Sequence, residues 1–399
     1  MKKLNRKFYC LSCEHILSEQ GFEFLEEQPI QGLPLNYHAE FCKNCGQKIE
    51  PKIEEIKNDY ATTITALKNP KIKVVAFVAP SVRTGIGECF GLSGDMQQKI
   101  VTALKKLGAY EVFSMNFGAD LTIHEESLEF QERMSSKQNL PMFTSCCPAW
   151  VNYVTQVYPQ IKNNLSTCKS PQQMFGAAIN NIYTKINNFK PTDIFILSVV
   201  PCLAKKVERL RPNINSGVGF DVDAAITTTE LAELIKNNNI DFKALEDSPF
   251  DSLFKDYSGY GSMFGISGGV LLSVVNNTYP NAKITKKTTE SIVEYKINND
   301  GEIFYAAKVQ GIISAKKVIE DVINKTSKYS LIEVMACAGG CVGGPGQPIT
   351  KDINSRTEII KNAQKNAKIV NSRDNLMVKK LYNEHISRDY AEILFHEKR

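Results

Sequence analysis

The chain has 399 residues, enough for one large hydrophobic core or about two to three smaller domains. Its 43% hydrophobic and 23% charged residues are ordinary for a globular protein. The net charge of +5 is small and no dense lysine and arginine patch interleaves with aromatic residues, so composition argues against nucleic-acid binding.

The apolar stretches are too short for a secretion signal or a membrane span. The basic start, MKKLNRKFYCLSCEH, contains only a short apolar run, whereas a signal peptide needs roughly 7–15 apolar residues. The longest apolar run, Ile194–Val200, is far below the roughly 20 residues of a transmembrane helix. We therefore expect a soluble, cytoplasmic protein with no membrane partner.

The chain begins with a unit of its own, residues 1–50, which contains two Cys-x-x-Cys pairs. An odd total of 11 cysteines without a secretion signal argues against a disulfide framework and favours metal binding or redox chemistry. The two pairs predict a tetrahedral four-sulfur site, formed by Cys10, Cys13, Cys42 and Cys45. Structural zinc, a rubredoxin-like iron and one 4Fe–4S cluster all remain open as its metal.

Residues 51–70 are charged and predict a helical connector, and from residue 71 the pattern changes to alternating strands and helices. Strands are expected at 72–79, 110–115, 193–200 and 331–335. A helix capped by Asp95 should run to Lys106, and further helices are expected at 121–134, 230–236 and 315–324. Residues 298–301 (NNDG) predict a hairpin. We expect an α/β fold with two βα lobes and mostly parallel sheets, followed by a helical tail over 351–399 without a further strand.

Four cysteines lie where a predicted strand gives way to a loop. Cys147 follows a short apolar run, Cys202 follows the most apolar strand, and Cys337 and Cys341 lie in a glycine-rich loop after the strand at 331–335. The carboxyl ends of parallel strands meet at one crevice, and four thiolates can bind a 4Fe–4S cluster. Buried, inert cysteines are the plainer alternative.

These loops resemble the three signature motifs of the FeFe hydrogenases. They read TSCCPAW at 144–150, VPCLAKK at 200–206 and EVMACAGGCVGGPGQP at 333–348. The resemblance extends from Val74 through Gln347, and residues 375–399 are more weakly similar to the small-subunit segment of the family. Within the motifs Val200, Ala338 and Pro345 depart from the usual pattern, which affects rate or oxygen sensitivity more than reaction class.

The resemblance implies an H-cluster: a 4Fe–4S cluster joined to a two-iron subsite with carbonyl, cyanide and dithiolate ligands. Its ligands would be Cys147, Cys202, Cys337 and Cys341, of which Cys341 would bridge to the two-iron subsite. The residues that would surround this subsite are Pro80, Ser81, Gln172, Lys205, Phe264 and Met335. For Phe264 and Met335, ordinary core packing is an equally good interpretation.

The resemblance also implies a proton relay from Cys146 through Glu126, Ser166 and Glu129, ending near Arg133. Glu126, Glu129 and Arg133 have the i, i+3, i+7 spacing that puts them on one helix face. A thiol beside a ligand cysteine suits acid–base work. Carboxylates on a helix face are otherwise ordinary solvent-facing residues.

The sequence as a whole predicts a hydrogenase that interconverts protons, electrons and molecular hydrogen. Expected partners are a ferredoxin-type electron carrier and the maturation proteins that insert the two-iron subsite. A hydrogen or redox sensor and a non-catalytic iron–sulfur assembly protein are the alternatives. The retained Cys146 thiol and the lack of a recognisable signalling segment in the sequence argue against a sensor. Retention of Cys146, Lys205 and the glutamates argues against an assembly protein.

Overall fold

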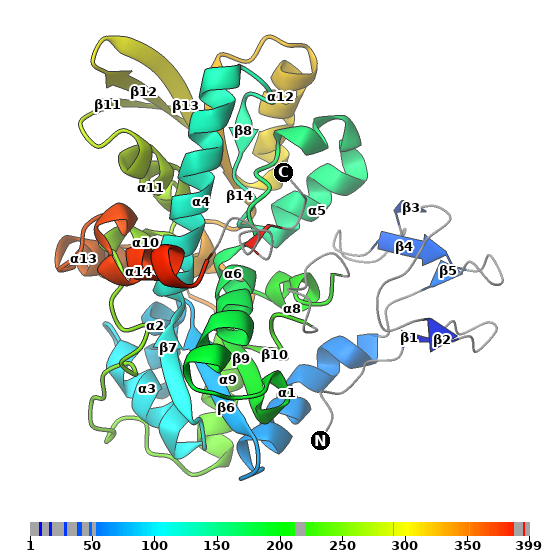
Figure 1. Ribbon diagram of the computed structural model, residues 1–399, viewed down its shortest axis with the longest axis vertical. Coiled ribbons are helices and arrows are strands. Elements are labelled where there is room, and N and C mark those ends of the chain that lie inside the picture. The colour runs from blue at the N-terminus through cyan, green and yellow to red at the C-terminus, as the bar shows by residue number, and fades with distance from the viewer. Residues whose placement is uncertain are drawn as a thin grey trace.

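The computed structural model describes residues 53–211, 220–289, 291–350, 352–386 and 394–395, together with the backbone of five short strands before residue 50. Two β-sheets lie toward opposite ends of the long axis, and helices pack around and between them (Figure 1). None of the described helices is both long and apolar enough to cross a bilayer. The expected α/β architecture with two lobes is confirmed.

The first sheet is fully parallel and has the strand order β10-β9-β6-β7. Its strands are β6 (Lys73–Val78), β7 (Glu111–Ser114), β9 (Ile194–Val200) and β10 (Ala224–Thr227). All residues of β6 except Lys73 are buried, as expected for a central strand covered by helices on both faces.

The second sheet is mixed and has the order β11-β12-β13-β14-β8. Its strands are β8 (Met142–Phe143), β11 (Lys283–Thr288), β12 (Ile292–Asn299), β13 (Glu302–Gln310) and β14 (Tyr329–Met335). The predicted hairpin joins β12 and β13, and Asp300 and Gly301 both have positive φ, at 51° and 95°. The outer strand β11 is largely exposed and rich in lysine and threonine, which protects an edge strand from unwanted pairing.

Helices make up most of the remaining described chain. They are α1 (Ile53–Leu67), α2 (Val82–Gly85), α3 (Gln97–Lys106), α4 (Met115–Ser136), α5 (Pro148–Val157), α6 (Pro171–Ala178), α7 (Thr184–Ile186), α8 (Ala204–Glu208), α9 (Thr228–Asn237), α10 (Gly259–Met263), α11 (Gly269–Thr278), α12 (Ile312–Ile323), α13 (Ile353–Lys365) and α14 (Leu376–Glu384). Several helix starts differ by a few residues from the sequence prediction. Helix α3 begins at Gln97 with Met96, not the expected Asp95, at its N-cap position. The Asp95 carboxylate still accepts a hydrogen bond from the Gln97 amide at 3.0 Å.

Helix α4 joins the two lobes and carries the predicted relay residues. It begins at Met115 rather than Leu121, because Ser114 at the end of β7 caps it through a side-chain bond to the Asn116 amide. The buried apolar residues that follow Ser114 therefore belong to the helix. Figure 1 shows α4 running from the parallel sheet to the mixed sheet.

The C-terminal tail is helical, but its connecting segments add isolated bridges to the main body. Ile369 pairs with Ser258, and Phe395 pairs with Cys168. The fully buried Asp120 carboxylate on α4 accepts hydrogen bonds from the Ser258 amide at 2.7 Å and from the Asn375 side chain at 2.9 Å. One carboxylate thus fastens the tail to the helix that joins the lobes.

The N-terminal strands are β1 (Phe8–Tyr9), β2 (Ile16–Leu17), β3 (Gln28–Pro29), β4 (His38–Phe41) and β5 (Lys48–Ile49), paired as a two-stranded and a three-stranded sheet. The predicted metal ligands Cys10, Cys13, Cys42 and Cys45 lie outside the described residues. Helix α1, within the expected connector, is fixed by a fully buried ion pair between Asp59 and Arg209.

Candidate active site

The four predicted ligand cysteines line one cavity between the two sheets. Cys147 lies at the start of α5, Cys202 follows β9, and Cys337 and Cys341 follow β14. Parallel strands of both sheets thus deliver cysteines to the same place from opposite sides. The space among the lining residues, including the part open to solvent, is about 730 Å³.

The electrostatics of these cysteines fit a cationic group among them. Burial raises the pKa of Cys202 to about 11 and of Cys337 to about 12, and it raises the pKa of Cys341 well above the usual value. Repulsion from neighbouring thiolates adds to each shift, and Cys147 contributes to all three. Bound positive metal ions would offset this repulsion and stabilise the thiolate forms, so the donor set fits an iron–sulfur cluster.

The four cysteines surround a cavity. Among the residues that the structure describes, no three His, Cys, Asp or Glu side chains converge as ligands of one metal ion. The cysteines lie around a cavity instead, and backbone can approach it closely. A Cβ on Gly340 would collide with the Ser267 amide, and a Cβ on Gly344 with the Pro201 carbonyl, so side chains at these positions would force the loops apart.

The six residues expected around the two-iron subsite also line this cavity. They are Pro80, Ser81, Gln172, Lys205, Phe264 and Met335. The Ser81 hydroxyl is buried and has no hydrogen-bond partner among the described residues, so it can donate to a bound ligand. Phe264 and Met335 line the cavity and also pack in a small apolar cluster with Cys146. The two interpretations from the sequence, core residue and pocket wall, therefore both apply.

Lys205 is held by two hydrogen bonds at the rim of the cavity. Its ammonium donates to the Cys146 carbonyl at 3.0 Å and to the Glu208 carboxylate at 2.8 Å. The same Glu208 oxygen accepts from the Ser170 hydroxyl at 2.9 Å, and Gln172 donates to the Lys205 carbonyl at 3.0 Å. Glu208 is absent from the site predicted by sequence, although its i+3 spacing from Lys205 was a usable signal.

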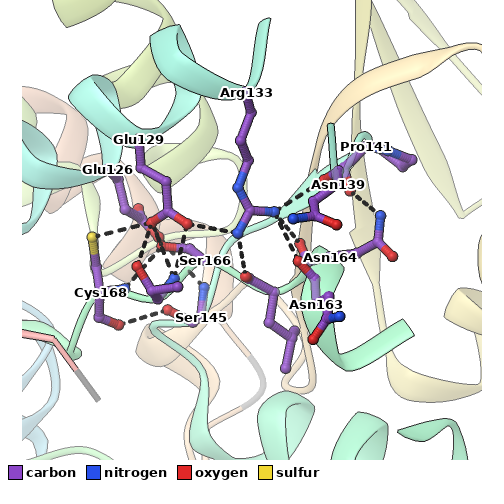
Figure 2. Close-up of polar contacts among 12 residues, drawn as sticks. Glu126, Glu129, Arg133, Asn139, Pro141, Ser145, Asn163, Asn164, Ser166 and Cys168 are labelled. Atoms are coloured by element: carbon purple, nitrogen blue, oxygen red, sulfur yellow. Dashed lines mark hydrogen bonds and ion pairs between the residues drawn. The ribbon is translucent and has the colours of Figure 1, made fainter. Parts of the chain in front are cut away.

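Three of the predicted relay residues, Glu126, Glu129 and Arg133, lie on α4, and Ser166 lies beside them (Figure 2). Glu126 and Glu129 are 0% and 3% exposed, and Ser166 is 0% exposed. Ser166 reaches them because its amide donates to the Phe143 carbonyl at 2.7 Å, which places residues 165–166 alongside β8. Spacing alone could predict the helix residues but not this pairing.

Glu126, a member of the predicted relay, is fully buried. Burial raises its pKa to about 8, and a side-chain hydrogen bond with Ser166 opposes the rise. One carboxyl oxygen accepts a long, 3.5 Å bond from the Ser145 amide, and the other, Oε2, has no hydrogen-bond partner among the described atoms. At neutral pH the carboxyl is therefore protonated and able to donate. Burial and the charge of Glu126 also raise the pKa of the Cys146 thiol.

Glu129 is surrounded by hydrogen-bond donors. It pairs with the Arg133 guanidinium at 2.6 Å and accepts from the Ser166 hydroxyl at 3.1 Å. The Thr167 amide and hydroxyl donate to it at 3.0 and 3.1 Å, and the Cys168 thiol lies 3.6 Å away. The sequence prediction gives Thr167 and Cys168 no role, because their proximity follows from the placement of the 165–169 segment.

One further buried acid near the site was not predicted. Glu333 on β14 is 0% exposed and accepts hydrogen bonds from backbone amides at the start of α11, including Leu271 at 3.0 Å. Its charge contributes to the raised pKa of both Cys146 and Glu126. The only sequence signal was an acidic residue inside an apolar strand.

Comparisons with known proteins agree with this geometry. Residues 72–345 match the family model described as the iron-only hydrogenase large subunit, C-terminal domain. The chain is 38% identical over 344 residues to Iron hydrogenase 1 from Clostridium pasteurianum, covering 81% of this chain and 60% of that protein. The chain therefore spans less than two thirds of that relative's length.

A solved structure and a more distant relative complete the comparison. A variant of an FeFe-hydrogenase from Chlamydomonas reinhardtii aligns with a TM-score of 0.74 and 27% identity, covering 85% of this chain and 98% of that one. A cytosolic Fe-S cluster assembly factor from Danio rerio is 27% identical over 312 residues, covering 73% of this chain and 76% of that protein. The chain belongs to the iron-only (FeFe) hydrogenase family.

Proposed function

We propose that this protein catalyses the reversible conversion of two protons and two electrons to molecular hydrogen at an H-cluster. The observation that carries the proposal is one cavity lined by four cysteines, the Cys146 thiol and Lys205. Two buried acids lie near that thiol, since Glu126 accepts from the amide of the adjacent residue, Ser145, and Glu129 follows it on α4. A purely structural iron–sulfur site has no need of a protonatable path from the cavity wall.

The side chains around the cavity would hold and shield the cofactor. Cys147, Cys202, Cys337 and Cys341 would bind the 4Fe–4S cluster, and Lys205 and Ser81 would donate hydrogen bonds to ligands of the two-iron subsite. When bound, the H-cluster would pass electrons to or from the carrier and would provide the iron site at which hydrogen is formed or cleaved. The apolar walls exclude water there, which strengthens those hydrogen bonds.

The relay would move protons between the cavity and the outer end of α4. The Cys146 Sγ atom would exchange a proton with the substrate site, and Glu126 would reload it from its protonated carboxyl. The Ser166 hydroxyl both donates and accepts, so it can pass a proton between Glu126 and Glu129. No net charge needs to remain on any buried member after one full transfer.

The proposed organisation also includes parts that are outside this site. Residues 1–50 would bind one metal, as zinc, iron or a 4Fe–4S cluster, and 51–70 would connect it to a catalytic domain at 71–350. Residues 351–399 would form a small-subunit-like tail. A cytoplasmic ferredoxin-type carrier would supply or accept electrons, and maturation proteins would insert the two-iron subsite.

An infrared spectrum of the anaerobically matured protein tests the proposal. Carbonyl and cyanide stretching bands that shift when hydrogen is added are the expected result. A maturation system that loads another FeFe hydrogenase but produces no such bands here would refute the enzyme. That result would favour a role in iron–sulfur cluster assembly, the role stated in the name of the Danio rerio relative. Bands with hydrogen-dependent shifts but turnover too slow for metabolism would instead favour a sensor.

The Glu126→Gln variant is expected to lose hydrogen turnover by about 100-fold or more, the range that a positioned proton-transfer group contributes. Glutamine fills the same space, but its amide cannot release a proton to Cys146. Turnover with an artificial reductant measures the loss, and unchanged infrared bands show that the cluster is still bound. Full activity would remove Glu126 from the pathway.

The same variant should change how stability depends on pH. The pKa of Glu126 is about 8 in the folded protein, against about 4.3 in an unfolded chain, so its ionisation disfavours folding. Stability in the wild type is therefore lost as pH rises toward 8, whereas glutamine does not titrate. We expect the free energy of unfolding of the variant, relative to the wild type, to be higher at about pH 9 than at about pH 5. Denaturant unfolding at both pH values measures this difference. A pH-independent difference would contradict the raised pKa.

A further inference from the structure

The outer end of the relay lacks an obvious group to exchange protons with water. Arg133 ends the predicted chain, but an arginine has no acceptor atom and keeps its proton at any pH that a protein survives. It can orient Glu129 and balance its charge. It cannot pass a proton onward.

The contacts of Arg133 reinforce this conclusion. Its Nη1 donates to the carbonyls of Asn139, Asn163 and Asn164 at 3.0 to 3.3 Å, and its Nη2 donates to Glu129 and to the Leu165 carbonyl at 2.8 Å (Figure 2). The side chain is only 9% exposed. Arg133 is thus a fixed structural clamp on Glu129 and the 163–165 segment.

Thr167 has the properties that Arg133 lacks. Its Oγ1 lies 3.1 Å from Glu129 Oε2, and a hydroxyl both donates and accepts hydrogen bonds. The residue is half-buried, whereas Ser166 is fully buried and Cys168 is 1% exposed. Among the described partners of Glu129, Thr167 therefore combines a transferable proton with a side chain that is not fully buried.

We propose that the Thr167 hydroxyl is the outer terminus of the proton pathway, linking Glu129 to solvent. During hydrogen formation the hydroxyl gives its proton to Glu129 and takes another from a water molecule or hydronium ion at the surface. During hydrogen oxidation both transfers run in reverse. Each transfer breaks one O–H bond and forms another, and no electron moves. This inference rests on the proposed function.

The test compares three variants of the matured holoenzyme. Thr167→Val keeps the side-chain shape and the backbone amide bond to Glu129 but removes the hydroxyl, and Thr167→Ser keeps the hydroxyl. Thr155→Val is the matched control, since Thr155 is also half-buried, and its hydroxyl bonds to the Val151 carbonyl on α5, away from the relay. Thr167→Ala serves in place of valine if the valine variant does not load the cluster.

Two measurements are made on each variant. The first is hydrogen turnover in H₂O and D₂O. The second, without turnover, is the rate at which the carbonyl and cyanide infrared bands respond to a pH jump, which reports proton arrival at the cavity. Thr167→Val should slow both by tenfold or more and enlarge the solvent isotope effect. Thr167→Ser should restore both rates, and Thr155→Val should match the wild type.

Less than tenfold slowing of proton arrival in Thr167→Val would overturn the inference and leave another exit for Glu129. Slowing of turnover without slowing of proton arrival would also overturn it, because that result identifies a structural role. A wild-type protein that forms no carbonyl and cyanide bands would refute the proposed function itself. The two failures are therefore distinguishable.

Discussion

The Cys146→Ala variant should lose hydrogen turnover by about 100-fold or more while its cluster remains bound. Cys146 is 8% exposed and packs with Phe264 and Met335 in the cavity wall. Water therefore has little room to take the place of the thiol in proton transfer. Alanine leaves Glu126 without a group through which to reach the cavity. Turnover measures the loss of activity, and infrared spectra of the same matured sample show whether the cluster is still bound.

Cys89→Ala is the matched control for Cys146. Cys89 is a partly buried cysteine that does not line the cavity, and its loss should leave both measurements unchanged. Turnover within a few fold of wild type in Cys146→Ala would show that protons reach the cofactor by a route that bypasses the thiol. Loss of the infrared bands would instead assign Cys146 to cofactor binding.

The Cys337→Ala variant should fail to retain the 4Fe–4S cluster. Three remaining thiolates leave one iron without a protein ligand, and the buried cavity offers no described carboxylate or imidazole as a substitute. The variant should also melt at a lower temperature than the reconstituted wild type, because cluster binding stabilises the folded state by mass action. Iron and sulfide analysis after anaerobic reconstitution measures the loss.

This second prediction does not require the two-iron subsite, so it can be tested before any maturation. Cys89→Ala again provides the control and should bind as much iron as the wild type. Equal iron in Cys337→Ala would show that the cluster is held elsewhere, with the N-terminal cysteines as the first place to look.

Local signals in the sequence were sufficient for most strands and for the position of the site. The strand at 194–200 is a continuous apolar run, and such runs are typical of buried parallel strands. Cys202 and Cys337 each follow a predicted strand, so loops at strand ends could be expected to carry the site. That these two strands belong to different sheets, both ending at the same cavity, follows only from the fold. The face of α4 that carries Glu126 and Glu129 followed from helical spacing.

Contacts between distant segments could not be predicted in this way. In the sequence Asp120 resembles any helix carboxylate, and only the fold shows that it binds Ser258 and Asn375. Thr167 resembles an ordinary loop residue until its segment is paired beside β8. Hydrogen-bond partners depend on three-dimensional placement, whereas periodicity reports only which face of an element is buried.

The position of the cavity at the meeting point of both sheets has a consequence for how the protein acquires its cofactor. Cys202 and Cys341 lie far apart in the chain, and the strands that deliver them, β9 and β14, belong to different sheets. Contacts of such long sequence separation form late, after their loop-closure entropy has been offset by other packing. A nascent chain therefore presents scattered, unligated thiols that are open to oxidation. The binding site for the cluster comes into existence only when both lobes have folded.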